Sequence, residues 1–525
     1  MEPHDFGWIS LLPPLVAIGL AVWTRHVFLS LFTGILVGGS ILNWDPDRGI
    51  ISVNPLEGFV TVMRDFVVPS VGNTDNAAVL ILLVCISGFV ALMQLSGAMT
   101  AFAFMASRHV TNPLRAHVAV WFSGLVIFFS DTANTLILGP VYTPIFDRLR
   151  ISREKLAYLI DSTASPVAVL VPTTSWGAYI MGLIIAENAN MTSGEAMKTL
   201  VSAIPYQFYA LGSLALILIL AFFKTDFGPM RGAERRVAET GELFRKGATP
   251  LRIEVPQDVP EDAANKAWTM GWGLIGLFAG TIVMFLYTGG VWDRPDPTPL
   301  KDAISNADGT LSVMLGFIVG SLVIGGRMIA RKTKGTKVVD EWIKGGAAIF
   351  PVLAILVFAW SLGAICNNDN LGTAGYVTQI AQQSLPVVWI PAVIFLVGAA
   401  MSFATGTSWG SYAILMPIAI PLGNDLGISQ ALVIGSVLSG GLFGDHCSPI
   451  SDTTILASIG SASDLMDHVR TQLPYALLAA LAAAIAYYVA AKTGSAWGLA
   501  ACIAVLVAFV AFIWMMRRGR ASAST

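Results

Sequence analysis

A dense polar run lies at residues 445–454, where the sequence is Asp-His-Cys-Ser-Pro-Ile-Ser-Asp-Thr-Thr. It separates the apolar stretches 432–443 and 455–459, and it holds two carboxylates, Asp445 and Asp452, and one imidazole. A charged group in hydrocarbon costs several kcal/mol, so such side chains usually face a cavity or a transport pathway. We therefore interpret the run as part of a transport site whose cargo includes a small cation.

Three further polar segments interrupt apolar regions. With the first run they make four breaks: Ser130–Thr135, Thr173–Gly177, Thr405–Gly410 and Ser448–Thr454. Na+ prefers oxygen ligands, which Ser, Thr, Asn, Asp and the carbonyls freed at a helix break supply. For a single Ser or Thr, a bond to a helix carbonyl is the simpler interpretation, but the four breaks together favour a site. The candidate cation- or substrate-binding residues are Asp131, Thr132, Asn134, Thr135, Thr174, Ser175, Thr405, Thr407, Ser408, Ser448, Ser451, Asp452 and Thr453.

Carboxylates in such a site also attract protons. Burial disfavours a charged carboxylate, whereas a nearby cation restores it, so one Asp can hold either H+ or Na+. The predicted Na+ ligands are Asp131, Asn134, Asp452 and Thr453, and the candidate proton-coupling residues are Asp161, Asp445, His446 and Asp452. Asp161 has a second interpretation as a helix partner. Two roles for His446 stay open: it titrates near neutral pH and senses it, or it holds Asp445 in place.

Composition places the chain in a membrane. Of 525 residues, 55% are hydrophobic and only 12% charged, and the mean hydropathy is +0.70. A soluble protein carries roughly twice that share of charge. Net charge −2 argues against nucleic acid as a partner, and the four scattered cysteines show no disulfide or metal pattern. The prediction is an all-α polytopic protein of the lipid bilayer.

Apolar stretches near 20 residues long match the ~30 Å of hydrocarbon in a bilayer. The predicted spans are 8–24, 26–43, 77–105, 156–172, 198–223, 267–289, 309–326, 345–365, 431–444, 473–491 and 494–516. Interrupted segments are predicted near 113–146, 173–186, 387–421 and 448–459. No small-residue cleavage site follows the acidic start at residues 1–5, so the first span is predicted to be a retained helix.

Lys and Arg predict the orientation in the cell inner membrane, because cytoplasmic loops carry an excess of them. They gather in 224–266, 327–344 and 517–525, which should be cytoplasmic. The loops near 44–75, 187–197, 291–308 and 366–384 contain few and should face outward. The N-terminus is thus predicted outside and the C-terminus in the cytoplasm.

Prolines indicate an internal repeat. A shift of 277 residues places Pro140, Pro144 and Pro172 on Pro417, Pro421 and Pro449. Proline removes a helical hydrogen bond, so shared prolines imply shared breaks. The loop after Pro144 is rich in Lys and Arg, but its counterpart after Pro421 contains neither and should lie on the opposite side. This pattern is typical of inverted repeats in secondary transporters.

The predicted organisation follows from that repeat. Residues 1–223 form the first inverted repeat and 267–516 the second. Each has about five transmembrane helices plus a re-entrant helical hairpin and broken helices. A cytoplasmic linker, 224–266, joins them, and a cytoplasmic tail, 517–525, follows. We interpret the linker as a solvated tether rather than a regulatory domain.

The segment Gly444–Thr454 resembles the signature of the NhaC-type Na+/H+ antiporter family. Gly406–Gly410, Phe129–Asn134 and Asp226–Met230 resemble further motifs of that family, and the likeness spans nearly the whole chain. The resemblance implies membership of a wider group of ion-coupled carriers that work by an elevator movement around two helical hairpins. It leaves the substrate open, because relatives with this motif include malate/lactate exchangers and suspected amino-acid carriers.

The leading functional hypothesis is a secondary antiporter that exchanges Na+, or Li+ or K+ in its place, for H+. Alternating access would expose ions bound at the breaks near the midplane. The alternative is a Na+- or H+-coupled transporter or exchanger of a small organic anion or amino acid. No Lys or Arg lies within the breaks, although helix N-termini could attract a carboxylate instead.

An enzyme is the third class of function, and the sequence argues against it. Adjacent side chains of a helix point in different directions, so Asp445, His446 and Cys447 do not suggest a nucleophilic constellation. No nucleotide-binding motif is present, so this chain does not drive transport with ATP, and no cofactor is expected. The oligomeric state stays open, with a homodimer as one option.

Overall fold

The computed structural model describes residues 6–24, 26–44, 55–108, 110–188, 191–250, 263–293, 298–299, 307–367 and 369–522. Within these ranges every regular element is a helix. Eight helices of the described chain are long and apolar enough to cross a membrane, or up to ten spans if each of two bent pairs is one span. The predicted all-α polytopic class is therefore confirmed. The acidic start at residues 1–5 and Arg252 of the linker lie outside the described residues.

The helices before the linker, and the first helix in it, begin and end as follows: η1 (Gly7–Leu11), α1 (Leu12–Thr24), α2 (Val27–Leu42), α3 (Pro55–Thr61), η3 (Val62–Val67), α4 (Val68–Gly72), α5 (Thr74–Leu95), α6 (Ala98–Ser107), α7 (Pro113–Val126), α8 (Asp131–Arg148), α9 (Arg153–Asp161), α10 (Ser165–Leu170), α11 (Ser175–Ala186), α12 (Ser193–Ala203), η4 (Ile204–Tyr206), α13 (Phe208–Phe223) and α14 (Gly228–Thr240). Two bent pairs occur here. One joins α9 and α10 to α11 at 43°, and the other joins α12 to α13 at 47°.

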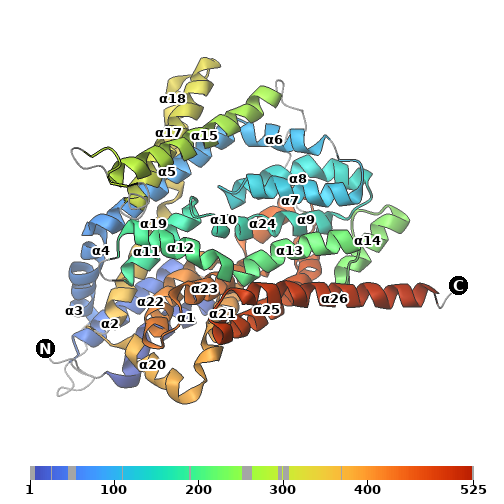
Figure 1. Ribbon diagram of the computed structural model, residues 1–525. Coiled ribbons are helices and arrows are strands. Elements are labelled where there is room, and N and C mark those ends of the chain that lie inside the picture. Colours follow the sequence, from blue (N-terminus) through green and yellow to red (C-terminus); the bar gives the residue numbers. More distant parts are fainter. Residues whose placement is uncertain are drawn as a thin grey trace.

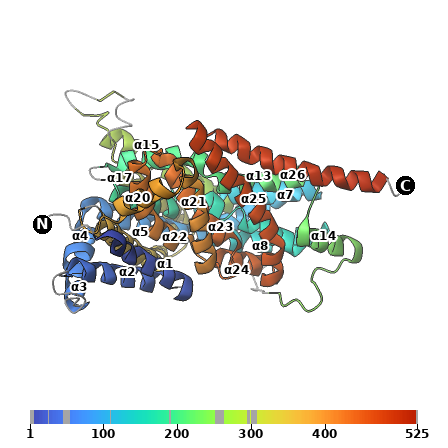
Figure 2. The same ribbon diagram turned by 90° about the horizontal axis from the view of Figure 1, so that it is seen from below.

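The later helices are α15 (Ala263–Thr288), α17 (Gly309–Ala330), α18 (Gly335–Ala348), α19 (Phe350–Cys366), α20 (Thr373–Ser384), η5 (Val387–Trp389), α21 (Ile390–Thr405), α22 (Ser408–Asp425), α23 (Gln430–Cys447), α24 (Asp452–Gly460), α25 (Leu465–Thr493) and α26 (Trp497–Ser522). Figure 1 shows α26 extending away from the other helices towards the C-terminus, with the N-terminus at the opposite side. The view from below shows the same long helix (Figure 2).

The helix boundaries recur at the spacing of the prolines. A shift of 277 residues carries the range Asp131–Arg148 of α8 onto the range Ser408–Asp425 of α22. Each of these helices contains two prolines, at 140 and 144 or at 417 and 421. The helices before them, α7 and α21, contact α8 and α22 respectively. The two helix pairs thus have matching positions in the chain.

The linker is docked on the protein. On α14 the side chains of Met230, Ala233 and Val237 are buried, at the spacing of one helix face. Four pairs tie residues 224–250 to the body: Lys155–Asp226 at 2.6 Å, Glu154–Arg236 at 2.8 Å, Ser152–Glu234 at 2.6 Å and Asp467–Arg245 at 2.9 Å. The predicted solvated tether is therefore wrong for residues 224–250. Its charges pair with buried charges at the start of α9, which hydropathy does not reveal.

We predict that this docking loosens at alkaline pH. Burial and the charge of Asp226 raise the pKa of Glu234 from 4.5 to about 7. A carboxyl group whose pKa is higher in the folded state stabilises that state fully below pH 4.5. This contribution is lost as pH rises through about 7. Hydrogen exchange in α14, corrected for its intrinsic pH dependence, should therefore accelerate between pH 6 and 8 (roughly the titration range). Glu234→Gln should remove that pH dependence, and an unchanged profile in this variant would assign it to another group.

Candidate functional site

The four predicted breaks all coincide with the starts of helices. Ser130, Thr174, Thr407 and Ser451 are the N-cap residues of α8, α11, α22 and α24. Ser and Thr are favoured at this position because their oxygen accepts from amides of the first turn. Ser130 accepts from the Ala133 amide and Thr174 from the Gly177 amide. The polar sequence thus ends one apolar helix and begins another, which leaves backbone groups available between them.

Two of these helices lie together and begin with aspartate. Helices α8 and α24 are in contact, and Asp131 and Asp452 are close enough to repel each other. One oxygen of each carboxylate accepts from the next amide, Thr132 at 2.7 Å and Thr453 at 2.9 Å. Asp452 is exposed and Asp131 half-buried. The two carboxylates are therefore not fully enclosed by the protein.

A third carboxylate is buried behind this pair. Asp445 is 2% exposed, and its Oδ1 accepts from the Ser451 hydroxyl at 3.0 Å. Its Oδ2 is buried without a hydrogen-bond partner. Ser408 of α22 lies beside this carboxylate, but its hydroxyl is outside hydrogen-bond geometry and is also unpartnered. These two oxygens come from the end of α23 and the start of α22, and they have unused capacity for a cation or a proton.

Two more buried oxygens lack donors. Asn134 donates to the carbonyls of Gly124 and Thr163, both at 3.1 Å, so its Oδ1 is left unpartnered. Asp161 accepts through Oδ2 from Thr454 at 3.1 Å and from Gln472 at 2.8 Å, while its Oδ1 has no partner. Buried polar atoms are rarely left unsatisfied, and such exceptions commonly indicate an absent ion, water or proton.

His446 does not hold Asp445. Its ring nitrogens bond to Ser162 Oγ at 2.8 Å and to Tyr209 Oη at 2.7 Å. That interpretation is therefore wrong, because residues adjacent on a helix face different neighbours.

The sequence interpretation also missed His468 and Gln472. His468 bonds to Gln472 at 2.7 Å and approaches Asp161 to 3.7 Å. Gln472 also donates to the backbone carbonyl of His446. These residues precede the predicted span at 473–491, so only their position beside an apolar segment could have indicated them.

Two indoles join the halves of the chain at the site. Trp176 of α11 donates to Asp131 Oδ2 at 3.1 Å and stacks on Trp409 of α22, with ring centroids 3.8 Å apart. Tyr179 donates to the Trp409 carbonyl at 2.8 Å. The sequence Thr-Ser-Trp-Gly occurs at residues 174–177 and again at 407–410, and this repetition is a signal for the contact. Sequence alone does not assign the tryptophans a role.

Several candidate hydroxyls bond to backbone, as the simpler interpretation predicts. Thr135 donates to the Thr132 carbonyl at 2.8 Å, Thr405 to the Met401 carbonyl at 3.0 Å and Ser448 to the Phe403 carbonyl at 2.8 Å. Thr132 lies near Asp131, and Ser175 is half-buried at the start of α11. Such hydroxyls keep lone pairs for a cation, but their protons are used.

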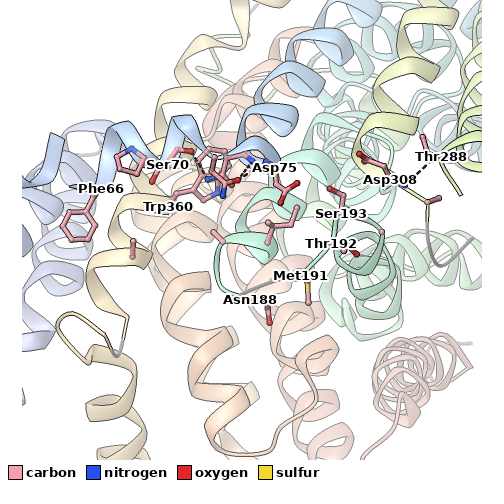
Figure 3. Close-up of a pocket in the computed structure, with 18 of the residues that line it drawn as sticks. Phe66, Ser70, Asp75, Asn188, Met191, Thr192, Ser193, Thr288, Asp308 and Trp360 are labelled. Atoms are coloured by element: carbon pink, nitrogen blue, oxygen red, sulfur yellow. Dashed lines mark hydrogen bonds between the residues drawn. The ribbon is translucent and has the colours of Figure 1, made fainter. Parts of the chain in front are cut away.

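A separate cavity of about 730 Å³ lies at the other end of α11. Figure 3 shows its wall, with Asp75 at the start of α5, Thr192 before α12, Asp308 before α17 and Trp360 on α19. The 12 residues of α11 span about 18 Å, so this cavity is distinct from the breaks. No three His, Cys, Asp or Glu side chains of the described chain cluster as a metal site.

Comparison with known proteins identifies a matching family and several relatives. A model of the Na+/H+ antiporter family matches residues 167–492. A Haemophilus influenzae protein described as uncharacterized is 31% identical over 547 aligned positions, covering 99% of this chain and 97% of that protein. A malate-2H+/Na+-lactate antiporter of Bacillus subtilis is 41% identical over 140 residues, 26% of this chain and 29% of that protein.

Among solved structures, the YdaH transporter of Alcanivorax borkumensis matches with a TM-score of 0.53 and 17% identity. The match covers 92% of this chain and 99% of that one. At this identity the likeness concerns the fold alone. The shared fold extends over nearly the full length of the chain.

Proposed function

The chain belongs to the Na+/H+ antiporter family and is a multi-pass secondary transporter, and from this premise we propose that it exchanges Na+, or Li+ or K+ in its place, for H+. The observation that carries the proposal is the set of buried oxygens without donors around Asp445, beside the accessible pair Asp131 and Asp452. The breaks contribute no Lys or Arg to balance these carboxylates. A bound cation or a proton can balance the negative charge of these carboxylates.

In this mechanism Na+ enters at Asp452 and is held by oxygens of Asp131, Asn134, Asp452 and Thr453. Asp445 and Asp161 lie behind this pair, so their protonation would compensate for the loss of the cation. Because like charges this close disfavour one another, the carboxylates cannot all stay ionised without a bound cation or proton. Competition between the two cargoes then couples their movements, and no cofactor is needed.

Alternating access requires a movement of the site, and we propose that α7–α8 and α21–α22 are re-entrant hairpins of two inverted repeats. The matching bounds of α8 and α22 support this arrangement. An elevator-type displacement of the breaks against the remaining helices would expose Asp452 to each side in turn. The wide cavity at the far end of α11 would then receive ions from the outer side.

The inverted repeat predicts opposite faces for two loops. Single cysteines at Arg150 and Asn424 should be labelled from the cytoplasm and from outside, respectively, because only the first loop is rich in Lys and Arg. Labelling in right-side-out and inverted vesicles measures this. Labelling of both positions from one side would rule out the inverted arrangement.

The test of the exchange itself is the dependence of Na+ affinity on pH. If Na+ and H+ compete for the same carboxylates, the apparent Km for Na+ should fall as pH rises on the Na+ side, and saturating Na+ should flatten that response. Proteoliposomes with an internal pH dye measure it. His446→Gln should preserve the effect, because His446 bonds to Ser162 and Tyr209 rather than to a carboxylate. A Km that does not change with pH would exclude a shared site.

A second candidate is a coupled carrier of a small carboxylate or amino acid, and one observation favours it. Helix α22 begins at Ser408 without an acidic residue in its first turn and without a side-chain cap at Thr407. A free helix N-terminus attracts a carboxylate. The same proteoliposomes supplied with malate, lactate or amino acids would distinguish the candidates, since a carrier requires the organic solute for proton movement.

A further inference from the structure

A second cavity, of about 570 Å³, lies where α14 begins beside the end of α26. Phe227, Gly228 and Arg231 line it from the linker, and Ile513, Met516 and Arg517 line it from α26. None of the break residues reaches this cavity. Its chemistry is therefore independent of the transport site.

The lining of this cavity carries an excess of positive charge. Arg231 is exposed and Arg517 half-buried, and the two are close enough to repel each other. Asp226 also lines the cavity, but its Oδ1 accepts from Lys155 and Tyr475, both at 2.6 Å. Lys155 thus balances that carboxylate. Within the described ranges neither arginine forms an ion pair, and Nε of Arg517 is buried without a hydrogen-bond partner.

The start of α14 adds a third positive group. Its N-cap residue is Phe227, which supplies no side-chain acceptor to the amides of the first turn. Pro229 in this first turn has no amide hydrogen, so the amides of Gly228 and Met230, together with the helix dipole, give this end a partial positive charge. Two arginines and an uncapped helix start around one cavity favour an anion with several acceptor oxygens.

The position of the cavity identifies the source of the anion. Helix α26 is largely uncovered, and Phe512 and Met515 are each 56% exposed near the cavity. Such side chains face acyl chains in a bilayer. In the following turn Arg518 stacks on Trp514, with its guanidinium carbon 3.9 Å from the ring centroid. Tryptophan and arginine at the end of an apolar helix mark the headgroup level. The cavity therefore spans the border between headgroups and acyl chains.

We propose that this cavity binds the phosphate of an anionic phospholipid. Arg231, Arg517 and the amides of Gly228 and Met230 at the start of α14 receive the phosphate oxygens, while Ile513 and Met516 contact an acyl chain. A soluble phosphate would use the same polar groups but not the apolar ones. The bound lipid joins the docked linker to α26, so it holds the linker against the membrane surface.

Native mass spectrometry of the full-length protein in detergent tests this proposal. Phosphatidylglycerol should bind more tightly than phosphatidylethanolamine or inorganic phosphate. Because a basic residue at a membrane surface strengthens such binding about five-fold, Arg231→Gln and Arg517→Gln should each weaken it by about that factor. The double variant should lose about thirty-fold.

Arg518→Gln is the matched control, because it removes an equal charge from the same helix but outside the cavity. It should keep wild-type affinity. Equal losses in Arg518→Gln and Arg517→Gln would overturn the proposal in favour of general charge attraction, and equal binding of inorganic phosphate would overturn the lipid assignment. Arg231 is exposed on α14, so Arg231→Gln provides the decisive measurement if the double variant does not fold. Unchanged affinity there would also overturn it.

Discussion

Asp131→Asn and Asp452→Asn are each expected to lower Na+-dependent proton movement by at least about a hundred-fold. The amide keeps the size of the side chain and accepts from the same first-turn amide, but it cannot release a proton or balance a cation. Removing one member of a closely interacting charged set typically costs several kcal/mol, which corresponds to a factor of this size. Sodium pulses on proteoliposomes containing an internal pH dye measure the loss.

The control for this pair is Glu239→Gln, which removes a carboxylate that is exposed on α14. It should transport at the wild-type rate. Asp161→Asn adds a second comparison, because its carboxylate bonds to Thr454 and Gln472 rather than to the accessible pair. It should impair proton release more than Na+ binding. Full activity in both Asp131→Asn and Asp452→Asn would remove the carboxylates from the mechanism and leave hydroxyl and backbone oxygens.

Sequence predicted the breaks well because their cause is local. Ser130 and Thr174 are N-caps, and prolines at 140 and 417 lie inside the helices that follow two of the breaks. Caps and prolines act within a turn or two, so their effect is encoded by neighbouring residues. The described helices accordingly begin within a few residues of the predicted interruptions.

The error about the linker and the contacts that sequence did not reveal concern residues far apart in the chain. Lys155 lies 71 positions from Asp226, yet their ion pair docks the linker. Trp176 reaches Asp131 across 45 positions, and Gln472 reaches Asp161 across 311. No local pattern specifies these partners. The high charge density of the linker therefore suggested exposure to solvent. Two of its charged side chains, Asp226 and Arg236, instead form ion pairs with buried charged residues at the start of α9.

We expect transport to depend on the close contact between α8 and α24 as well as on the carboxylates with which these helices begin. Gly139 lies about two turns after Asp131, and Gly460 lies about two turns after Asp452. A Cβ at Gly139 would collide with the backbone of Gly460, and a Cβ at Gly460 would lie 2.5 Å from the Thr135 carbonyl oxygen. Backbone atoms cannot rotate away as a flexible side chain can. Either alanine must therefore separate the helices and alter the spacing of the two carboxylates.

We expect Gly139→Ala and Gly460→Ala to lower transport by about ten- to hundred-fold, the effect of displacing reacting groups by ~1 Å. Overpacking should also cost about 1–3 kcal/mol of stability, so melting temperature is measured beside the transport rate. Gly232→Ala on α14 is the matched control, because a Cβ there meets nothing within 4 Å. Normal transport by Gly139→Ala would show that the Asp131–Asp452 spacing does not govern exchange. A loss of transport with an unchanged apparent Km for Na+ would instead indicate that helix contact limits the conformational step, since a displaced ligand pair must weaken Na+ binding.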